Sequence, residues 1–194
     1  MYIPDAILQP YIVQGLISEQ RHPFNDALRI YNYTHQCQFA RAWDDITLRC
    51  RGLIQDVQHE HIVCNVMQKF FNIEEHVTQG HALPVEEPLI TEKIDGSLGI
   101  LYWLNDEPWI ATRGSFTSEQ AQWATAWFRR YVPNGFFSPW DNVTHMFEIV
   151  YAANRIVVQY DFEGLVHLAT RDTTKVLRPG GSGVQAGEER PLAP

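Results

Sequence analysis

Lysine is scarce in this chain of 194 residues, which has fifteen basic residues but only three lysines, Lys69, Lys93 and Lys175. Acidic residues outnumber basic ones, so the formal net charge is −8 at pH 7. Proteins that bind duplex nucleic acid without sequence preference need a broadly basic surface. The charge therefore argues against such binding but leaves room for a local phosphate site. A composition poor in lysine also makes the position of each lysine more informative.

Other features are scarce or missing as well. No apolar run approaches the roughly 20 residues needed to cross a membrane. The amino terminus, MYIPDAILQPYIV, has no basic flank before an apolar core and does not resemble a secretory signal. The three cysteines, Cys37, Cys50 and Cys64, cannot all pair within the chain. We expect a cytoplasmic protein with no membrane partner, because thiols stay reduced in that compartment.

What the chain does contain predicts an α+β fold dominated by antiparallel strands, with one main helix. Hydrophobic residues make up 45% of the sequence and aromatic residues 12%, enough for one sizeable core. The segment TSEQAQWATAWFRRYV has helical spacing, and Thr117 and Gln120 fit a capping box. The domain should occupy residues 1–177, and residues 178–194, rich in Gly and Pro, should form a disordered tail.

The remaining elements are expected from alternation and turn residues. A weak helical pattern runs from residue 5 to residue 17. Turns are expected near 58–60, at Asn105-Asp106 and at Asn154. Strands are expected at 31–39, on both sides of the first turn within 50–66, at 89–104, at 108–116, on both sides of Asn154 within 145–160, and at 163–172.

The most informative segment is Lys93-Ile94-Asp95-Gly96-Ser97, which has an apolar, strand-like run on each side. A lysine two residues before an Asp-Gly turn can be held at the floor of a pocket, where its amine could attack phosphorus. Alone the pattern is weak, because a hairpin that carries a solvated lysine would have the same sequence. The rest of the chain has to distinguish the two.

Four other segments accompany this one in a fixed order, and together they resemble the covalent nucleotidyltransferases. The similarity extends from about Arg29 to Lys175 and is greatest to the T-even phage RNA ligase 1 family. It implies sheets of the nucleotidyltransferase (ATP-grasp-like ligase) type and an ATP-dependent RNA ligase of a bacterial or phage-infected cell. The motifs that carry the resemblance are CRGLI, MQKFFN, KIDGS, ATRGSFTSEQA and FEIVYAANRIVVQY.

The resemblance also implies roles for single residues. Lys93 would attack the α-phosphorus of ATP to give lysyl-AMP, AMP would pass to an RNA 5′-phosphate, and a 3′-hydroxyl would displace it. Asp95 would support the sealing step, with a turn-capping role as the alternative. The metal would be Mg²⁺ or Mn²⁺, with Glu148 as a possible indirect ligand. The expected nucleotide-binding residues are Arg51, Lys69, Glu92, Gly96, Arg113 and Glu148.

Two other patterns invite a functional interpretation that we do not adopt. Glu163-Gly164 looks like a later Glu-Gly motif of the family, but it begins only fifteen residues after Glu148. We expect Glu163 to be a turn residue, with Leu165 and Val166 in the wall of the adenine pocket. The spacing of His59, His61 and Cys64 could suit zinc, yet no fourth ligand is evident, and a polar hairpin turn explains it better.

The later motifs of the family are missing from this sequence. Relatives carry a second Glu-Gly strand, a Lys-x-Lys strand and, in the T-even phage enzyme, a helical carboxy-terminal domain. The fold is therefore expected to be incomplete at its carboxy-terminal end. A second polypeptide could supply the missing half, the chain could be a noncatalytic remnant that binds nucleotide or RNA, or it could be an unusual minimal ligase. The expected partner in each case is RNA, for example cleaved tRNA.

Overall fold

Two antiparallel sheets form the framework of the molecule in the computed structural model, which describes residues 2–78, 85, 87–88, 90–174, 184–186 and 192. The first sheet has the strand order β1-β2-β3-β4 and the second the order β6-β5-β7-β8-β9. The predicted α+β class with mainly antiparallel strands is confirmed. The strands are β1 (Ile17–His22), β2 (Asn25–Tyr33), β3 (Arg51–Asp56), β4 (His61–Cys64), β5 (Ser97–Leu104), β6 (Glu107–Thr112), β7 (Val143–Val150), β8 (Gly164–Asp172) and β9 (Val184–Ala186).

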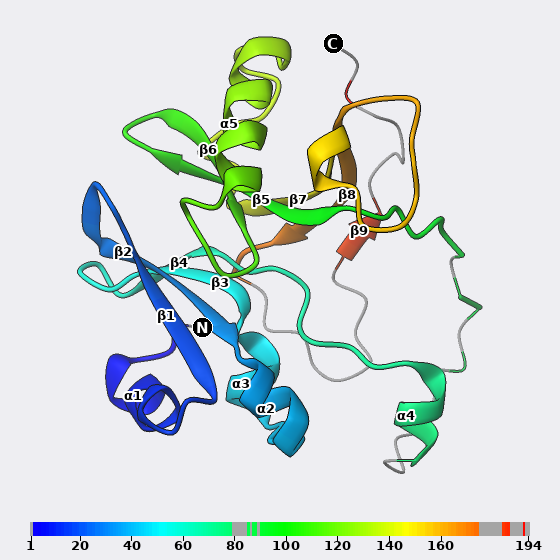
Figure 1. The fold of residues 1–194 in the computed structure, drawn as a ribbon. Helices are drawn as coiled ribbons and strands as arrows, with labels where there is room; N and C mark the ends of the chain where they lie inside the picture. The colour runs from blue at the N-terminus through cyan, green and yellow to red at the C-terminus, as the bar shows by residue number, and fades with distance from the viewer. Residues whose placement is uncertain are drawn as a thin grey trace.

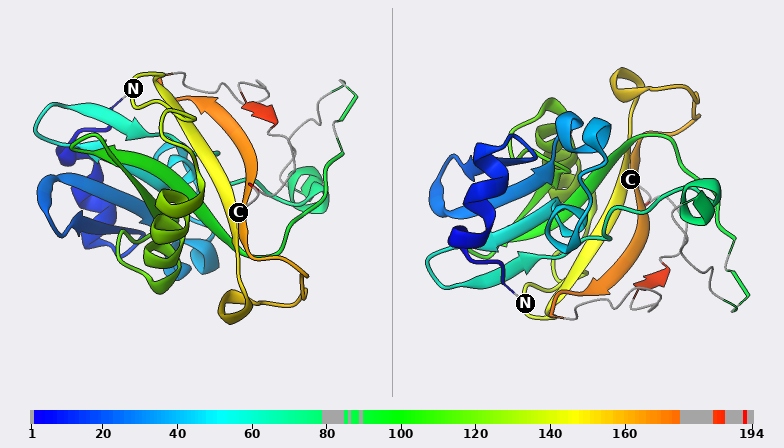
Figure 2. Two further views of the ribbon diagram at one scale, coloured as in Figure 1. Left: turned by 90° about the horizontal axis from the view of Figure 1, so that it is seen from above. Right: turned by 90° about the horizontal axis from the view of Figure 1, so that it is seen from below.

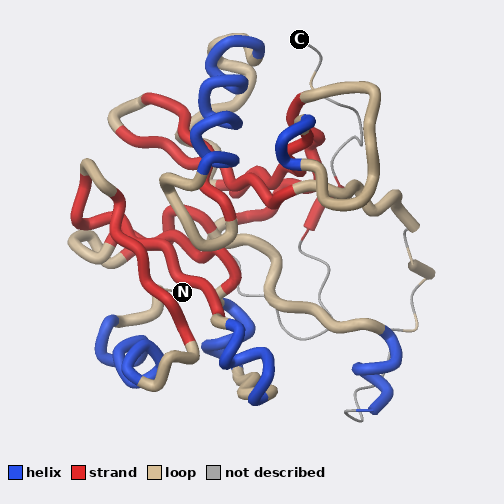
Figure 3. Tube along the Cα trace, viewed as in Figure 1, coloured by secondary structure: helices blue, strands red, loops and turns tan. Residues whose placement is uncertain are grey.

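The strands occupy the middle of the molecule, and most helices lie on the outside (Figure 3). Three short helices pack at one end of the first sheet (Figure 1). Seen from above and below, β7 and β8 lie on the side of the molecule away from α1 (Figure 2). The helices are α1 (Asp5–Val13), α2 (His35–Ala40), α3 (Asp45–Arg49), α4 (Ile73–Thr78), α5 (Glu119–Tyr131) and the 3₁₀ turn η1 (Ala152–Asn154). No helix in the described ranges is long and apolar enough to span a bilayer.

The amino-terminal helix is confirmed, but the strand expected at residues 31–39 is wrong beyond its third residue. β2 ends at Tyr33, and the side chain of Thr34 caps α2 by accepting a hydrogen bond from the Cys37 amide. Threonine in an extended conformation is a favoured helix N-cap, so this local bond ends the strand and starts the helix.

The two hairpins are where the sequence places them. β3 and β4 pair through the turn that follows Asp56, and His59 bonds to the carboxylate of Asp56. β5 and β6 pair through Asn105 and Asp106, whose φ angles of 51° and 63° lie in the left-handed region that Asn and Asp tolerate. The thiol of Cys64, at the end of β4, donates a hydrogen bond to the Leu101 carbonyl of β5.

Helix α5 covers one face of the second sheet, as its apolar stripe predicts. The buried residues Ala124, Trp127 and Phe128 pack with Phe147 and Ile149 of β7 in one hydrophobic cluster. The predicted capping box at Thr117 is wrong. The N-cap is Ser118, whose hydroxyl accepts from the Ala121 amide, so the helix begins one residue later than expected.

The second strand expected after Asn154 is also wrong. Residues 155–163 form an irregular loop between η1 and β8, and the strand predicted at 163–172 is confirmed as β8. Of the predicted tail, the structure describes only β9, which pairs with β8, and Leu192, whose amide donates to the Leu165 carbonyl. The rest of 178–194 lies outside the described residues, so the domain bounds stay a prediction.

The two sheets meet in a core that includes Ile30 and Ile54 from the first sheet and Ile100 and Met146 from the second. Gly52 of β3 has φ 87°, and a Cβ there would lie 2.6 Å from the Ile100 side chain and 3.2 Å from the Arg113 carbonyl oxygen. Glycine is therefore required at this point, both by the backbone conformation and by the close approach of the sheets. The segment between β4 and β5 leaves the body and carries α4, which stands apart from both sheets (Figures 1 and 2).

Candidate nucleotide-binding site

A cavity of about 1050 Å³ opens where the two sheets meet. Its walls come from β3, from the segment before β5, from the end of β6, and from β7 and β8. This volume is at the upper end of the range typical of ligand pockets. Six of the eight predicted site residues line it: Arg51, Glu92, Lys93, Gly96, Arg113 and Glu148.

Lys93 lies on an exposed stretch at the edge of this cavity. The strand-like run expected before the Asp-Gly turn does not form a strand, because β5 begins only at Ser97. Lys93 is therefore on a stretch of backbone without regular secondary structure rather than in a hairpin strand. Its side chain is exposed but close enough to Glu148 to interact electrostatically with it.

Gly96 has a structural reason to be glycine that the sequence did not reveal. A Cβ at this position would lie 2.4 Å from the Ile149 carbonyl oxygen and 3.1 Å from Cγ of Glu148. The start of β5 is therefore pressed directly against β7. The Gly96 amide also lies close enough to the Glu148 carboxylate to favour its charged form, which links the Lys93 segment to the carboxylate across the sheet.

Glu148 is the carboxylate of the cavity with the most perturbed acidity. Burial raises its pKa to about 7, although the Gly96 amide, Lys93 and Arg51 act in the opposite direction. A carboxyl group in a dry site prefers its neutral form unless it is paired. Glu148 can therefore gain or lose a proton near neutral pH, which is a property often found in functional sites.

Two arginines supply positive charge to the cavity. Burial lowers the pKa of Arg51, and neighbouring Arg113 lowers it further. The Arg51 guanidinium lies 5.2 Å from the centre of the Phe70 ring, and one of its nitrogens donates to the Met67 carbonyl at 3.4 Å. Arg113 donates to the Tyr33 hydroxyl at 3.2 Å. A half-buried guanidinium and an exposed one close to each other suit a phosphate chain.

Lys69 does not line the cavity but lies next to its cations. Its ammonium is 4.3 Å from the centre of the Phe71 ring and 5.8 Å from that of Trp43. Burial lowers the pKa of Lys69, Glu75 acts in the opposite direction, and the charges of Arg51 and Arg113 lower the pKa further. The prediction of a phosphate contact therefore needs this side chain to reach past the aromatic rings.

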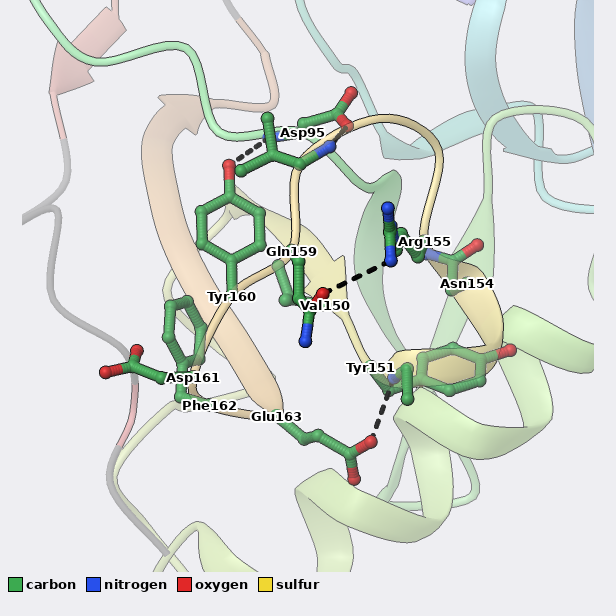
Figure 4. Close-up of a pocket in the computed structure, with 12 residues that line it drawn as sticks. Asp95, Val150, Tyr151, Asn154, Arg155, Gln159, Tyr160, Asp161, Phe162 and Glu163 are labelled. Carbon is green, nitrogen blue, oxygen red and sulfur yellow. Dashed lines mark hydrogen bonds between the residues drawn. The ribbon is translucent and has the colours of Figure 1, made fainter.

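Asp95 is placed differently from the role expected of it. Its carboxylate accepts hydrogen bonds from the amides of Val157 and Val158 at 2.7 and 2.9 Å, and its own amide donates to the Tyr160 hydroxyl at 2.8 Å. These amides lower the pKa of Asp95. The residue lines a separate cavity of about 350 Å³ inside the loop from Val150 to Glu163 (Figure 4). Asp95 thus anchors a loop, and its part in catalysis stays a prediction.

Several wall residues were not foreseen from the sequence. Ile156, Leu168 and Ala169 line the main cavity, whereas Leu165 and Val166, expected in its wall, are fully buried. The wall therefore lies further along β8 than expected. Glu163 accepts from the Ala152 amide and so closes the loop, in agreement with its interpretation as a turn residue.

The sequence does not identify Tyr33 as a neighbour of the site, and the reason is physical. Strand alternation puts Tyr31 and Tyr33 on the same face, but the register of β2 against β3 shifts between Tyr31 and Asn32. This irregularity at the strand end lets the Tyr33 hydroxyl reach Arg113. A β-bulge redirects side chains in this way, and no residue in the sequence marks its position.

The residues of the cavity suit a triphosphate better than they suit a divalent cation alone. Arg51 and Arg113 provide the donors that a phosphate chain needs. For the metal, Mg²⁺ is usually held by one or two carboxylates together with phosphate oxygens and water, and Glu148 is a carboxylate at hand. Among the described residues no three His, Cys, Asp or Glu side chains gather into a ready-made metal site. A metal would therefore need the nucleotide as a co-ligand.

Comparison with known proteins identifies the family of the chain. The family model for RNA ligases of the T4 RNA ligase 1 type matches residues 49–180, which include all eight predicted site residues. The chain is also 31% identical over 169 residues to the "Putative bifunctional polynucleotide kinase/RNA ligase" of Autographa californica nuclear polyhedrosis virus. That match covers 75% of this chain and 24% of the viral protein, so the chain spans about a quarter of its relative's length. The match of the family model over most of the chain shows that the protein belongs to the T4 RNA ligase 1 family.

Proposed function

We propose that this chain is an ATP-dependent RNA ligase, or its amino-terminal nucleotidyltransferase half, that becomes AMP-modified on Lys93. The observation that carries the proposal is the arrangement at the main cavity. A lysine on an exposed segment, a carboxyl group with a pKa of about 7 and two arginines line one space large enough for a nucleotide. Membership of the RNA ligase family supports RNA as the substrate.

The first step would be attack of the neutral Lys93 amine on the α-phosphorus of ATP. The N–P bond forms while the bond from the α-phosphorus to the β-phosphate oxygen breaks, and pyrophosphate leaves with that electron pair. The proton that Lys93 must lose can go to Glu148, the nearby group able to accept a proton near neutral pH. The 5′-phosphate of RNA would then displace Lys93 from AMP, and a 3′-hydroxyl would finally displace AMP.

The cationic wall would hold the part of ATP that leaves. Arg51 and Arg113 are rigid, bidentate donors suited to the β- and γ-phosphates, and they would stabilise the charge that develops on pyrophosphate. A divalent ion would neutralise the phosphates and would contact Glu148 only indirectly, through water. Gly96 would keep the Lys93 segment against β7, and Glu92 would stand at the same rim.

Resealing of cleaved tRNA is the substrate class we propose, and a second polypeptide is the partner that would supply the Glu-Gly and Lys-x-Lys motifs. The competing function is a noncatalytic protein that binds nucleotide or RNA. The exposure of Lys93 is what keeps this alternative in view, because attacking lysines are usually desolvated. A ligase forms a covalent bond between Lys93 and AMP, whereas a noncatalytic binding protein does not.

Incubation of the full chain with α-labelled ATP and Mg²⁺ tests for that bond. With only three lysines in the chain, peptide mapping identifies the modified residue without ambiguity. We expect an acid-labile label on the wild type and none on Lys93→Arg, which keeps the charge but removes the attacking amine. Lys175→Arg is the matched control and should be labelled normally.

Two results would change the assignment. Label that persists in Lys93→Arg would show that another residue is the nucleophile. Saturable ATP binding without any label, also in the presence of 5′-phosphorylated RNA, would favour the noncatalytic function.

A further inference from the structure

Tyr33 lies beside both arginines of the cavity. Its side chain is 6% exposed at the end of β2, and its hydroxyl oxygen accepts a hydrogen bond from Arg113 at 3.2 Å. Arg51 is also close enough to this side chain to interact with it electrostatically. The Arg113 guanidinium also lies 5.2 Å from the centre of the Tyr33 ring. Because the two arginines repel each other, a polar group beside both of them offsets part of that repulsion.

The same ring is the first of a row of aromatic side chains that ends at Lys69. The Tyr33 ring meets Trp43 edge to face, with centroids 5.1 Å apart, and Trp43 meets Phe71 in the same way at 5.6 Å. The Lys69 ammonium lies over Phe71 and Trp43. Each of these ring and cation contacts contributes modestly on its own, but together with the hydrogen bond from the ammonium to the Phe70 carbonyl they fix where the ammonium can lie.

We propose that Tyr33 is a positioning residue that fixes the spacing of Arg51, Arg113 and Lys69 for the phosphate chain of a nucleoside triphosphate. This rests on the proposed function, since it assumes that the phosphates lie at these cations. Flexible cationic side chains lose rotamer freedom on binding, and a scaffold that holds them beforehand removes that cost. Tyr33 therefore acts through the cations and need not touch the ligand.

The strand provides its own control residue. Tyr31 lies two positions earlier on β2, fully buried, and its hydroxyl is 3.5 Å from Asp5 on the other side of the sheet. Tyr31→Phe and Tyr33→Phe both remove one hydroxyl group from the same strand and leave the ring. Only Tyr33→Phe removes a hydrogen-bond acceptor from a cation of the cavity, namely Arg113.

Calorimetric titration of the full chain with ATP, AMP and inorganic tripolyphosphate separates the two kinds of effect. We expect Tyr33→Phe to weaken binding of ATP and of tripolyphosphate about tenfold, the loss that corresponds to one hydrogen bond of a charged group. AMP should bind as to the wild type within about twofold, and Tyr31→Phe should leave the ATP-to-AMP ratio unchanged. In a double-mutant cycle, Tyr33→Phe should add little to Arg113→Gln, because both act on one interaction.

The alternatives give different results. Equal weakening of AMP and ATP would mean general damage at the site and would overturn the proposal, as would unchanged tripolyphosphate binding by Tyr33→Phe. If the wild type binds neither ATP nor tripolyphosphate, the proposed function falls together with this inference. If Tyr33→Phe selectively weakens tripolyphosphate binding but Lys93 is never labelled, the inference stands and the proposed covalent step fails.

Discussion

Replacement of Gly96 by alanine perturbs the contact that holds the Lys93 segment to the second sheet. The added methyl carbon would lie 2.4 Å from the Ile149 carbonyl oxygen, whereas a relaxed contact between carbon and oxygen needs about 3.3 Å. The obstacle is backbone in the middle of a sheet, so it cannot rotate away. The start of β5 must therefore move from β7 by roughly 1 Å, the difference between these two distances.

Two costs follow from that displacement. Overpacking of a well-packed site destabilises by about 1–3 kcal/mol. The shift also moves the Gly96 amide away from Glu148, whose charged form it favours. Because the strand relaxes and the two costs overlap, we expect a total of about 3 kcal/mol. For a chain of this size that corresponds to a fall in melting temperature of about 10 °C.

Thermal and urea unfolding measure this loss, with Gly114→Ala as the matched control. Gly114 also lines the cavity, but a Cβ there would meet only Asn32 atoms at 3.5 Å or more, which is an ordinary contact. That variant should stay within about 0.5 kcal/mol of the wild type. The displacement of Lys93 in Gly96→Ala should also slow lysyl-AMP formation by about 100-fold. If both alanine variants unfold at the wild-type temperature, β5 and β7 are not in the close contact described above.

Three further changes test other parts of the structure. Asp95→Ala should increase hydrogen exchange at the two loop amides that Asp95 holds, by about tenfold or more, while β7 amides stay protected. Ser118→Ala should destabilise the protein by about 1 kcal/mol in urea unfolding and Thr117→Ala by much less, since only the former is the helix cap. For Glu148, the raised pKa of about 7 in the folded protein means that its contribution to stability is complete below its ordinary value and is lost as pH rises through about 7. Relative to Glu148→Gln, the wild type should therefore lose about 3 kcal/mol between pH 4 and pH 8, and parallel urea-unfolding curves would contradict the assigned shift.

Elements that depend on local signals were predictable from the sequence. The hairpin at Asn105-Asp106 and helix α5 each carry their own turn or periodic pattern, and both form where expected. The errors came where one distant contact outweighs the local pattern. The apolar run after Asn154 reads as a strand, yet Asp95 binds its amides and holds it as a loop. An aspartate 62 residues earlier in the chain leaves no trace in that run.

The candidate site also divides into residues that the sequence predicts and residues that only the structure places. Motifs in the right order brought Arg51, Lys93, Arg113 and Glu148 to one cavity, because the resemblance carries the fold as well as the residues. Residues outside the motifs could not be placed without coordinates. Tyr33 is such a case, since its position depends on a register shift in β2.

The net charge of −8 looked unfavourable for a protein that handles nucleotides, but the structure explains why it matters little. Charges farther apart than about 8 Å are largely screened at physiological ionic strength. The field at the cavity is therefore set by the cations that the fold gathers there, Arg51, Arg113 and nearby Lys69, and by Glu148, which is partly neutral at pH 7. Because Arg51 is partly buried, its attraction for phosphate is stronger than that of an arginine on an open surface. An acidic chain can thus present a local phosphate site without a basic surface that would bind nucleic acid indiscriminately.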